Sequence, residues 1–200
     1  MLKIEVASLK VHQFLSLSQA NGPGTRAVVW VQGCTLGCPG CFNVPTHPAV
    51  GGENVTVDVL FERIQALQNS IEGITISGGE PLQQQIGVAQ LLRRVKAETS
   101  LSVVLFTGFS WPELQKMGLR QPNTTRNSPL TLLQDVDVLI AGRYDQTQHL
   151  AQDLRGSTNK ITYFLTDRYT AQDMEAIPPA EVMITAEGDV IMSGIDPLKW

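Results

Sequence analysis

The chain has 200 residues, of which 42% are hydrophobic and 17% charged, and a formal net charge of -4. This balance is typical of a globular protein with one sizeable core, so we expect a single domain over residues 1–200. The mild acidity offers no basic surface to nucleic acid, and no apolar run approaches the ~18–20 residues that cross a bilayer.

Short apolar runs alternate with helical stretches along the chain. The start, residues 1–14, lacks the apolar core of a signal peptide, so a cytoplasmic location is expected. Residues 27–32 form a continuous apolar run, typical of a strand buried on both faces, and this run ends at a cysteine-rich loop. Further strands are predicted at residues 74–77, 101–106, 136–141, 161–165, 182–185 and 190–192. A tight turn over residues 186–189 would join the last two.

Helices are predicted between the first strands. Residues 59–70 carry apolar side chains at helical spacing, and Ser110 with Glu113 forms a predicted capping box at the start of a later helix. A helix after residue 81 would share one apolar face among Ile86, Ala89, Leu92 and Val95. Strands that alternate with helices indicate parallel βαβ units, so the predicted class is α/β with an open, mainly parallel sheet.

In such sheets the functional loops follow the carboxyl ends of the strands. Here these loops are residues 33–43, 78–81, 107–109 and 142–145, and they hold most of the unusual residues of the chain. Two polar stretches carry no predicted element, namely residues 118–130 and 143–160.

All three cysteines lie within eight residues, with the spacing Cys34-x3-Cys38-x2-Cys41. An odd number in so short a stretch is a poor disulfide framework, so the thiolates indicate iron or zinc. The glycines between them give the backbone the freedom to turn three sulfurs toward one centre. Three thiolates would leave one iron of a [4Fe–4S] cluster without a protein ligand, whereas an electron-transfer cluster normally has four.

Two other interpretations of this loop are open. A structural zinc site needs four ligands, so His47 would have to complete a Cys3His zinc or iron site. The cysteines could also be unliganded structural residues, but a loop rich in Gly and Pro has few apolar neighbours to pack against.

Several motifs resemble those of the radical S-adenosylmethionine activating enzymes. Residues 33–43 resemble their cluster loop, and Cys-Pro-Gly-Cys-Phe-Asn is most similar to the anaerobic ribonucleotide reductase activators. One departure is Gly40, where many radical enzymes carry an aromatic residue before the third cysteine. The other similar segments, in the same order as in the family, are the lead-in at 21–26, the Gly-Gly-Glu motif at 77–82, and residues 107–109, 137–144 and 155–159.

The resemblance implies an incomplete (β/α) barrel with a [4Fe–4S] cluster held by Cys34, Cys38 and Cys41. The open iron would chelate S-adenosylmethionine, whose reductive cleavage yields a 5′-deoxyadenosyl radical. The implied product is a glycyl radical on a partner such as the anaerobic ribonucleotide reductase, with reduced flavodoxin or ferredoxin as electron donor. The alternatives are a radical enzyme for a small molecule, as the 7-carboxy-7-deazaguanine synthases are, and a non-catalytic iron–sulfur or zinc protein.

The Gly-Gly-Glu motif is implied to bind the methionine part of the cofactor. Gly78 and Gly79 would allow close backbone approach, and Glu80 would offer its carboxylate to the ammonium group. Taken alone, the same residues also fit a plain strand-to-helix turn, with Glu80 favoured by the helix dipole.

The remaining candidates each have a structural alternative. Gly40 and Phe42 could touch the adenine, although Phe42 could equally be a core residue. Thr107 could reach the ribose or the methionine part, or serve only in a turn. Arg143 lies where a cofactor carboxylate could be met, but a solvated or ion-paired arginine is the preferred interpretation, and Asn43 and Asn159 are weaker candidates.

Overall fold

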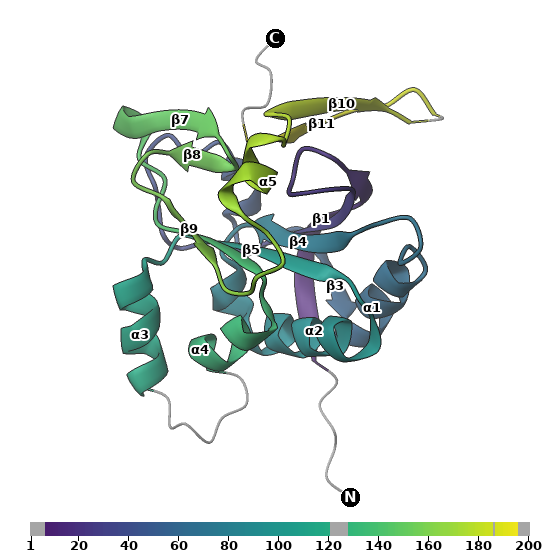
Figure 1. Cartoon of the computed structure of the whole chain (residues 1–200), viewed down its shortest axis with the longest axis horizontal. Coiled ribbons are helices and arrows are strands. Elements are labelled where there is room, and N and C mark those ends of the chain that lie inside the picture. The colour runs from purple at the N-terminus through teal and green to yellow at the C-terminus, as the bar shows by residue number, and fades with distance from the viewer. Residues whose placement is uncertain (1–6, 121–127, 186, 196–200) are drawn as a thin grey trace, which may run out of the picture.

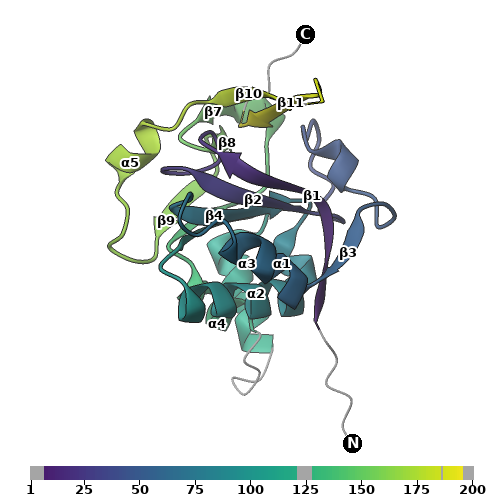
Figure 2. The ribbon, with the colours of Figure 1, turned by 90° about the vertical axis from the view of Figure 1, so that its right-hand side faces the viewer.

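A seven-stranded sheet runs through the centre of the computed structural model, which describes residues 7–120, 128–185 and 187–195. Helices α1 to α4 cover one face of the sheet, and two hairpins with helix α5 lie over the other (Figures 1 and 2). In spatial order the strands are β3 (Glu53–Thr56), β1 (Ser8–Ser18), β2 (Arg26–Val31), β4 (Gly73–Gly78), β5 (Ser102–Thr107), β6 (Val138–Ala141) and β9 (Ile161–Phe164).

The four strands at the centre of the sheet, β2, β4, β5 and β6, are parallel neighbours. Strand β1 is antiparallel to β2 and β3, and β9 is antiparallel to β6. All four central strands were predicted, because each is an apolar run buried on both faces. The fold is therefore a mixed α/β fold with a mainly parallel central sheet.

The helices that cover the sheet are α1 (Val57–Gln65), α2 (Gln85–Glu98), α3 (Trp111–Arg120) and α4 (Pro129–Leu132). Helix α1 begins before the predicted residue 59, because the side chain of Thr56 accepts a hydrogen bond from the Val59 amide and caps it. It also ends at Gln65 rather than at residue 70, since the amides of Leu67 and Gln68 bond three residues back in a tighter turn.

The predicted face of α2 is wrong at one position. Ile86 is 59% exposed and points away from the core. The buried face follows Val88, Leu91, Leu92 and Val95, a spacing of three and four residues that stays on one side of the helix. The other three predicted positions, Ala89, Leu92 and Val95, are buried as expected.

Apolar side chains form a core on each face of the sheet. The larger cluster lies between the sheet and α1 to α4, with Leu60, Phe61 and Leu92 fully buried. The smaller one, on the hairpin face, joins β5 and β6 to Leu154 and Met174, the latter in α5 (Ala171–Glu175).

Two hairpins lie in the C-terminal part of the chain, and the first falls in residues 143–160, for which no element was predicted. Between β6 and β9 the chain forms β7 (His149–Gln152) and β8 (Arg155–Ser157), an antiparallel pair. The predicted C-terminal hairpin is confirmed as β10 (Ala180–Ile184) and β11 (Val190–Gly194), a separate two-stranded sheet. Part of its turn, residue 186, and residues 121–127 of the polar stretch lie outside the described residues. None of the described helices has the length and apolarity of a membrane span.

Candidate functional site

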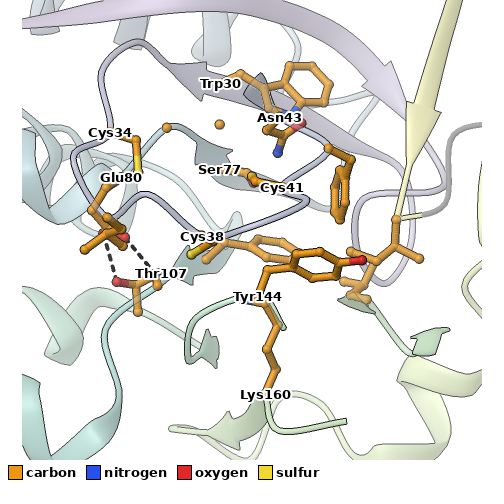
Figure 3. A pocket seen from close by; sticks show the side chains of 18 of the residues that line it. Trp30, Cys34, Cys38, Cys41, Asn43, Ser77, Glu80, Thr107, Tyr144 and Lys160 are labelled. Carbon is orange, nitrogen blue, oxygen red and sulfur yellow. Dashed lines mark hydrogen bonds between the residues drawn. The ribbon is translucent and has the colours of Figure 1, made fainter. Parts of the chain in front are cut away.

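The loops that follow the four parallel strands meet around one pocket (Figure 3). The cysteine loop follows β2, the Gly-Gly-Glu loop follows β4, Thr107 and Gly108 end β5, and Tyr144 follows β6. This is the edge of the sheet at which the sequence predicted the functional loops. The three cysteines, Phe42, the Gly-Gly-Glu motif and Thr107 line the pocket, whereas Gly40 does not.

The cysteine loop is turned by glycines and fastened to its neighbours on both sides. Gly37 and Gly40 have φ angles of +65° and +71°, in the left-handed region that favours glycine. The Gly33 amide donates to the Thr46 carbonyl at 2.7 Å, which ties the loop to the short helix η1 (Val44–Thr46). On the other side, the Thr35 amide donates to the Gln83 side chain at 3.1 Å, in the helix η2 (Pro81–Gln84).

The three thiols all lie on the wall of the pocket, each partly buried. Burial raises the pKa of the Cys34 and Cys41 thiols, so these sulfurs give up their protons on binding a metal rather than beforehand.

The spacing of the donors bears on the zinc interpretation. Ligands of one tetrahedral zinc ion lie about 3.8 Å apart, because each bond is about 2.3 Å long. Among the residues described in the structure, no three Cys, His, Asp or Glu side chains converge closely enough to hold a single metal ion. Three thiolates that each bind a different iron of a cluster stand farther apart than the ligands of one zinc ion, and the three thiols here share one pocket wall.

The Glu80 carboxylate is buried at the pocket wall, with 1% of the residue exposed. Its Oε1 accepts hydrogen bonds from the Leu82 amide at 2.9 Å and from the Thr107 hydroxyl at 2.8 Å. Its Oε2 accepts from the Gly108 amide at 2.7 Å. Burial raises the pKa of this carboxyl, although all three hydrogen bonds act in the opposite direction.

Glu80 therefore caps η2, as the strand-to-helix interpretation expected, and it also lines the pocket. The Thr107 hydroxyl donates a hydrogen bond to this carboxylate. It also accepts a hydrogen bond from the Phe109 amide at 3.1 Å, as expected of a turn residue. Oε1 already accepts two hydrogen bonds, whereas Oε2 accepts one and so keeps capacity for another donor.

Lys160 is a charged pocket residue that the sequence did not predict. It immediately precedes β9 and lies across the pocket from the cysteine loop (Figure 3). Its ammonium donates to the Gly142 carbonyl. Burial lowers its pKa, while the nearby Glu80 and the thiols of Cys38 and Cys41 act to raise it. Only the strand topology could have placed Lys160 in the pocket. Because β9 is antiparallel to β6, its first residues lie at the edge of the sheet where the parallel strands end.

Aromatic rings form another wall of the pocket. Phe42 packs edge-to-face on Tyr144, with ring centroids 5.5 Å apart at 78°, and Trp30 also lines the cavity. Phe42 is 37% exposed, so it is a pocket residue rather than a core residue. Tyr144 and Trp30 were not predicted.

The weaker candidates divide between the pocket and its surroundings. Asn43 lines the pocket. Arg143 instead forms an ion pair with Glu113 at 2.8 Å, as the preferred interpretation had it. The Asn159 side chain donates to the Arg143 carbonyl at 2.9 Å and does not line the pocket. His47 lines the pocket, with its Nε2 atom 3.3 Å from Sγ of Cys41.

Most of the chain is similar in sequence to known proteins. A family model described as a 4Fe-4S single cluster domain matches residues 20–163. A protein of Vibrio cholerae is 31% identical over 165 residues, which cover 79% of this chain and 99% of the relative. Its counterparts in Enterobacteria phage T4 (32%, covering 74% and 88%) and Escherichia coli K12 (28%, covering 78% and 99%) carry the same name, anaerobic ribonucleoside-triphosphate reductase-activating protein. Among solved structures, QueE of Escherichia coli is 14% identical, with a TM-score of 0.44 over 50% of this chain and 53% of its own.

Proposed function

Since the chain belongs to the family of anaerobic ribonucleoside-triphosphate reductase-activating proteins, we propose that it is a radical S-adenosylmethionine enzyme. In this proposal it removes one hydrogen atom from a glycine Cα of its partner and leaves a glycyl radical there. The observation that carries the proposal is the meeting of the cysteine loop and the Gly-Gly-Glu loop at one pocket. The proposal treats residues 1–200 as one domain whose sheet is part of an incomplete (β/α) barrel and which acts in the cytoplasm.

The cysteines would hold the [4Fe–4S] cluster, and the open iron would receive S-adenosylmethionine. When bound, these groups supply a 5′-deoxyadenosyl radical through one-electron cleavage of the sulfonium, with reduced flavodoxin or ferredoxin as the proposed electron donor. Cys34, Cys38 and Cys41 each contribute one thiolate to a different iron. The donor set supports this, because three thiols share one wall and no group of described side chains fits a single ion.

The other pocket residues would bind the parts of the cofactor. Gly78 and Gly79 offer backbone to the methionine part, and Glu80, held by Thr107, offers its free acceptor capacity to the ammonium group. Lys160 lies half-buried at the opposite wall and offers a positive charge to the carboxylate.

For the adenine, the rings of Phe42 and Tyr144 are the proposed contacts. Gly40 would act on the same part of the cofactor through its backbone, from its turn beside Cys41.

The partner would be a glycyl-radical enzyme, and the family name favours the anaerobic ribonucleotide reductase. A glycine Cα is reached only if a loop of the partner enters the pocket beside the cofactor. The pocket opens at the loop edge of the sheet, where such a loop can approach.

The first test is cleavage of the cofactor. The protein is reconstituted anaerobically with iron and sulfide, reduced with dithionite and mixed with S-adenosylmethionine, and 5′-deoxyadenosine and methionine are measured. We expect both products in the wild type and none in Cys38→Ala. Thr35→Ala, which changes the same loop but leaves the three thiols, keeps most of the activity. Absence of cleavage by wild type with a full cluster would contradict the radical chemistry.

A second step tests the partner. Addition of the anaerobic ribonucleotide reductase is expected to give the doublet electron paramagnetic resonance signal of a glycyl radical on that protein. Cleavage without this signal would favour a small-molecule substrate instead.

A further inference from the structure

His47 makes a contact with the cysteine loop that the motifs do not account for. Its imidazole Nε2 lies 3.3 Å from Sγ of Cys41, and both residues are half-buried at the pocket wall. The sequence suggested His47 only as the fourth ligand of a zinc or iron site, so the geometry has to decide between two roles.

The contact does not suit a fourth ligand of the cluster. In a [4Fe–4S] cluster with three thiolates, the vacant coordination position belongs to a different iron from the one that Cys41 binds. A fourth ligand would therefore stand apart from all three sulfurs, whereas the His47 ring touches one of them. The position suits a hydrogen bond to a ligating sulfur.

The direction of this hydrogen bond follows from the chemistry of the ligand. A thiolate bound to iron carries no proton, so Sγ of Cys41 can only accept, and the His47 Nε2–H must donate.

The backbone on both sides of the ring fixes its place. The Cys34 amide donates to the His47 carbonyl at 3.0 Å. The buried Gln32 side chain donates to the carbonyls of Pro45 at 3.2 Å and Pro48 at 2.8 Å.

We propose that His47 is a positioning residue that acts through Cys41 and raises the reduction potential of the cluster. Reduction adds negative charge to the cluster and its thiolates, and a donor aimed at a sulfur stabilises that charge. A given reductant then loads a larger fraction of clusters with an electron. The inference rests on the 4Fe-4S domain and not on the reaction that the cluster supports.

The test is a redox titration of the reconstituted protein without S-adenosylmethionine, followed by electron paramagnetic resonance of the reduced cluster. For His47→Leu we expect the ratio of reduced to oxidised cluster at a fixed potential to fall about tenfold, which is 59 mV for a one-electron couple. His47→Gln, whose amide can donate, recovers part of the shift. A His47→Leu protein with a full cluster and the wild-type potential would overturn the proposal.

His12→Leu is the matched control for disturbed packing. His12 contacts the same Gln32 side chain at 2.7 Å but is not among the residues that line the pocket, so the potential should stay at the wild-type value. An equal shift in His12→Leu would assign the effect to the scaffold and overturn the proposal.

A second measurement decides the matter even if His47→Leu fails to retain a cluster. In wild-type protein with ¹⁵N-labelled histidine, pulsed resonance spectra of the reduced cluster should contain a weak nitrogen coupling, transmitted through the hydrogen bond. A strong coupling would identify a direct iron–nitrogen ligand, and no coupling would show that the contact is absent, and either result overturns the proposal. Failure of cofactor cleavage would leave this spectrum unchanged, so the two proposals fail separately.

Discussion

At the scale of single residues, the junction between the two loops of the site depends on Gly79. Its amide donates to the Val31 carbonyl at 2.8 Å, and the next amide, of Glu80, donates to the Gly33 carbonyl at 2.9 Å. A Cβ at Gly79 would collide with the backbone of Gly33, which cannot rotate away. The Gly-Gly-Glu loop and the cysteine loop can therefore lie side by side only if this position has no side chain.

We expect Gly79→Ala to lower the free energy of unfolding by about 1–3 kcal/mol, as overpacking does elsewhere, and to reduce the iron bound after reconstitution. Gly108→Ala is the matched control. Its Cβ would meet the end of the Leu36 side chain, which can turn aside, so a loss below about 1 kcal/mol is expected. Urea unfolding and iron analysis measure both effects, and equal losses in the two variants would contradict the argument.

The residues found by sequence and those missed differ in how they are encoded. Cys34, Cys38 and Cys41 were identifiable because their spacing within one loop carries the chemistry. Lys160 was missed because it meets the other pocket residues only through the fold. His47 was considered only as a metal ligand, since no sequence pattern shows that its ring points at Cys41.

At the scale of elements, Glu113 at the start of α3 makes two kinds of contact, one within the helix cap and one with the loop after β6. The Glu113 carboxylate accepts from the Ser110 amide at 2.8 Å, which is the predicted reach-back of a capping box. It also binds Arg143, the residue that follows β6 by two positions, at 2.8 Å. The cap therefore fastens the helix to the loop beside the pocket.

These contacts make the stability of the protein depend on pH. The Ser110 amide, and then the Arg143 guanidinium, lower the pKa of Glu113 to about 2 from its ordinary 4.5. Since the unfolded chain binds this proton at a higher pH, the contribution is complete above about pH 5 and is lost as the pH falls toward 2.

Glu113→Gln should lower the free energy of unfolding at pH 7 by about 1 kcal/mol, a modest figure because the side chain is 37% exposed and screened. The difference from wild type should shrink between pH 5 and pH 3 in urea titrations of the metal-free protein. Glu175→Gln, in the exposed part of α5, should change stability by less than about 0.5 kcal/mol at either pH. A difference that stays constant across this pH range would contradict the assignment of the effect to the Glu113 charge.

Elements were predictable where burial on both faces left an apolar run, and less so elsewhere. The four central strands follow such runs, whereas β7 and β8 have only four and three residues. Ala151 in β7 and the turn residues Asp153 and Leu154 have positive φ. The sequence does not predict a left-handed backbone at these three positions, because residues with a Cβ rarely adopt positive φ.

At the scale of the whole molecule, Arg26 joins the starts of the central strands at the edge opposite the pocket. It is fully buried, and its guanidinium donates to neutral oxygens, among them the carbonyls of Pro23 (3.0 Å), Ile74 (2.6 Å) and Ser102 (3.1 Å). None of the ion pairs among the described residues involves it. The arginine of the lead-in motif therefore has a structural place, since one planar group ties β2, β4 and β5 to the loop before them.

Two effects compete when Arg26 is replaced by methionine. Burial of the Arg26 charge costs desolvation free energy, and the same burial lowers the pKa of its guanidinium. Replacement by methionine removes this cost. Against this, three buried carbonyls lose a donor, at about 1–3 kcal/mol for each group left unsatisfied. Because the charge already has a full set of hydrogen bonds, the second effect should win, and Arg26→Met should lower the free energy of unfolding by about 3 kcal/mol.

Arg26→Lys should be nearly as damaging, because an ammonium cannot reproduce the planar fork that reaches all three strands. Arg63→Met, at an exposed arginine 3.7 Å from Glu53, should change stability by less than about 0.5 kcal/mol. Urea unfolding of the three variants under identical conditions measures these differences. A loss below about 1 kcal/mol in Arg26→Met would mean that the carbonyls find other donors, and that the sheet does not depend on this residue to align the strands that carry the pocket loops.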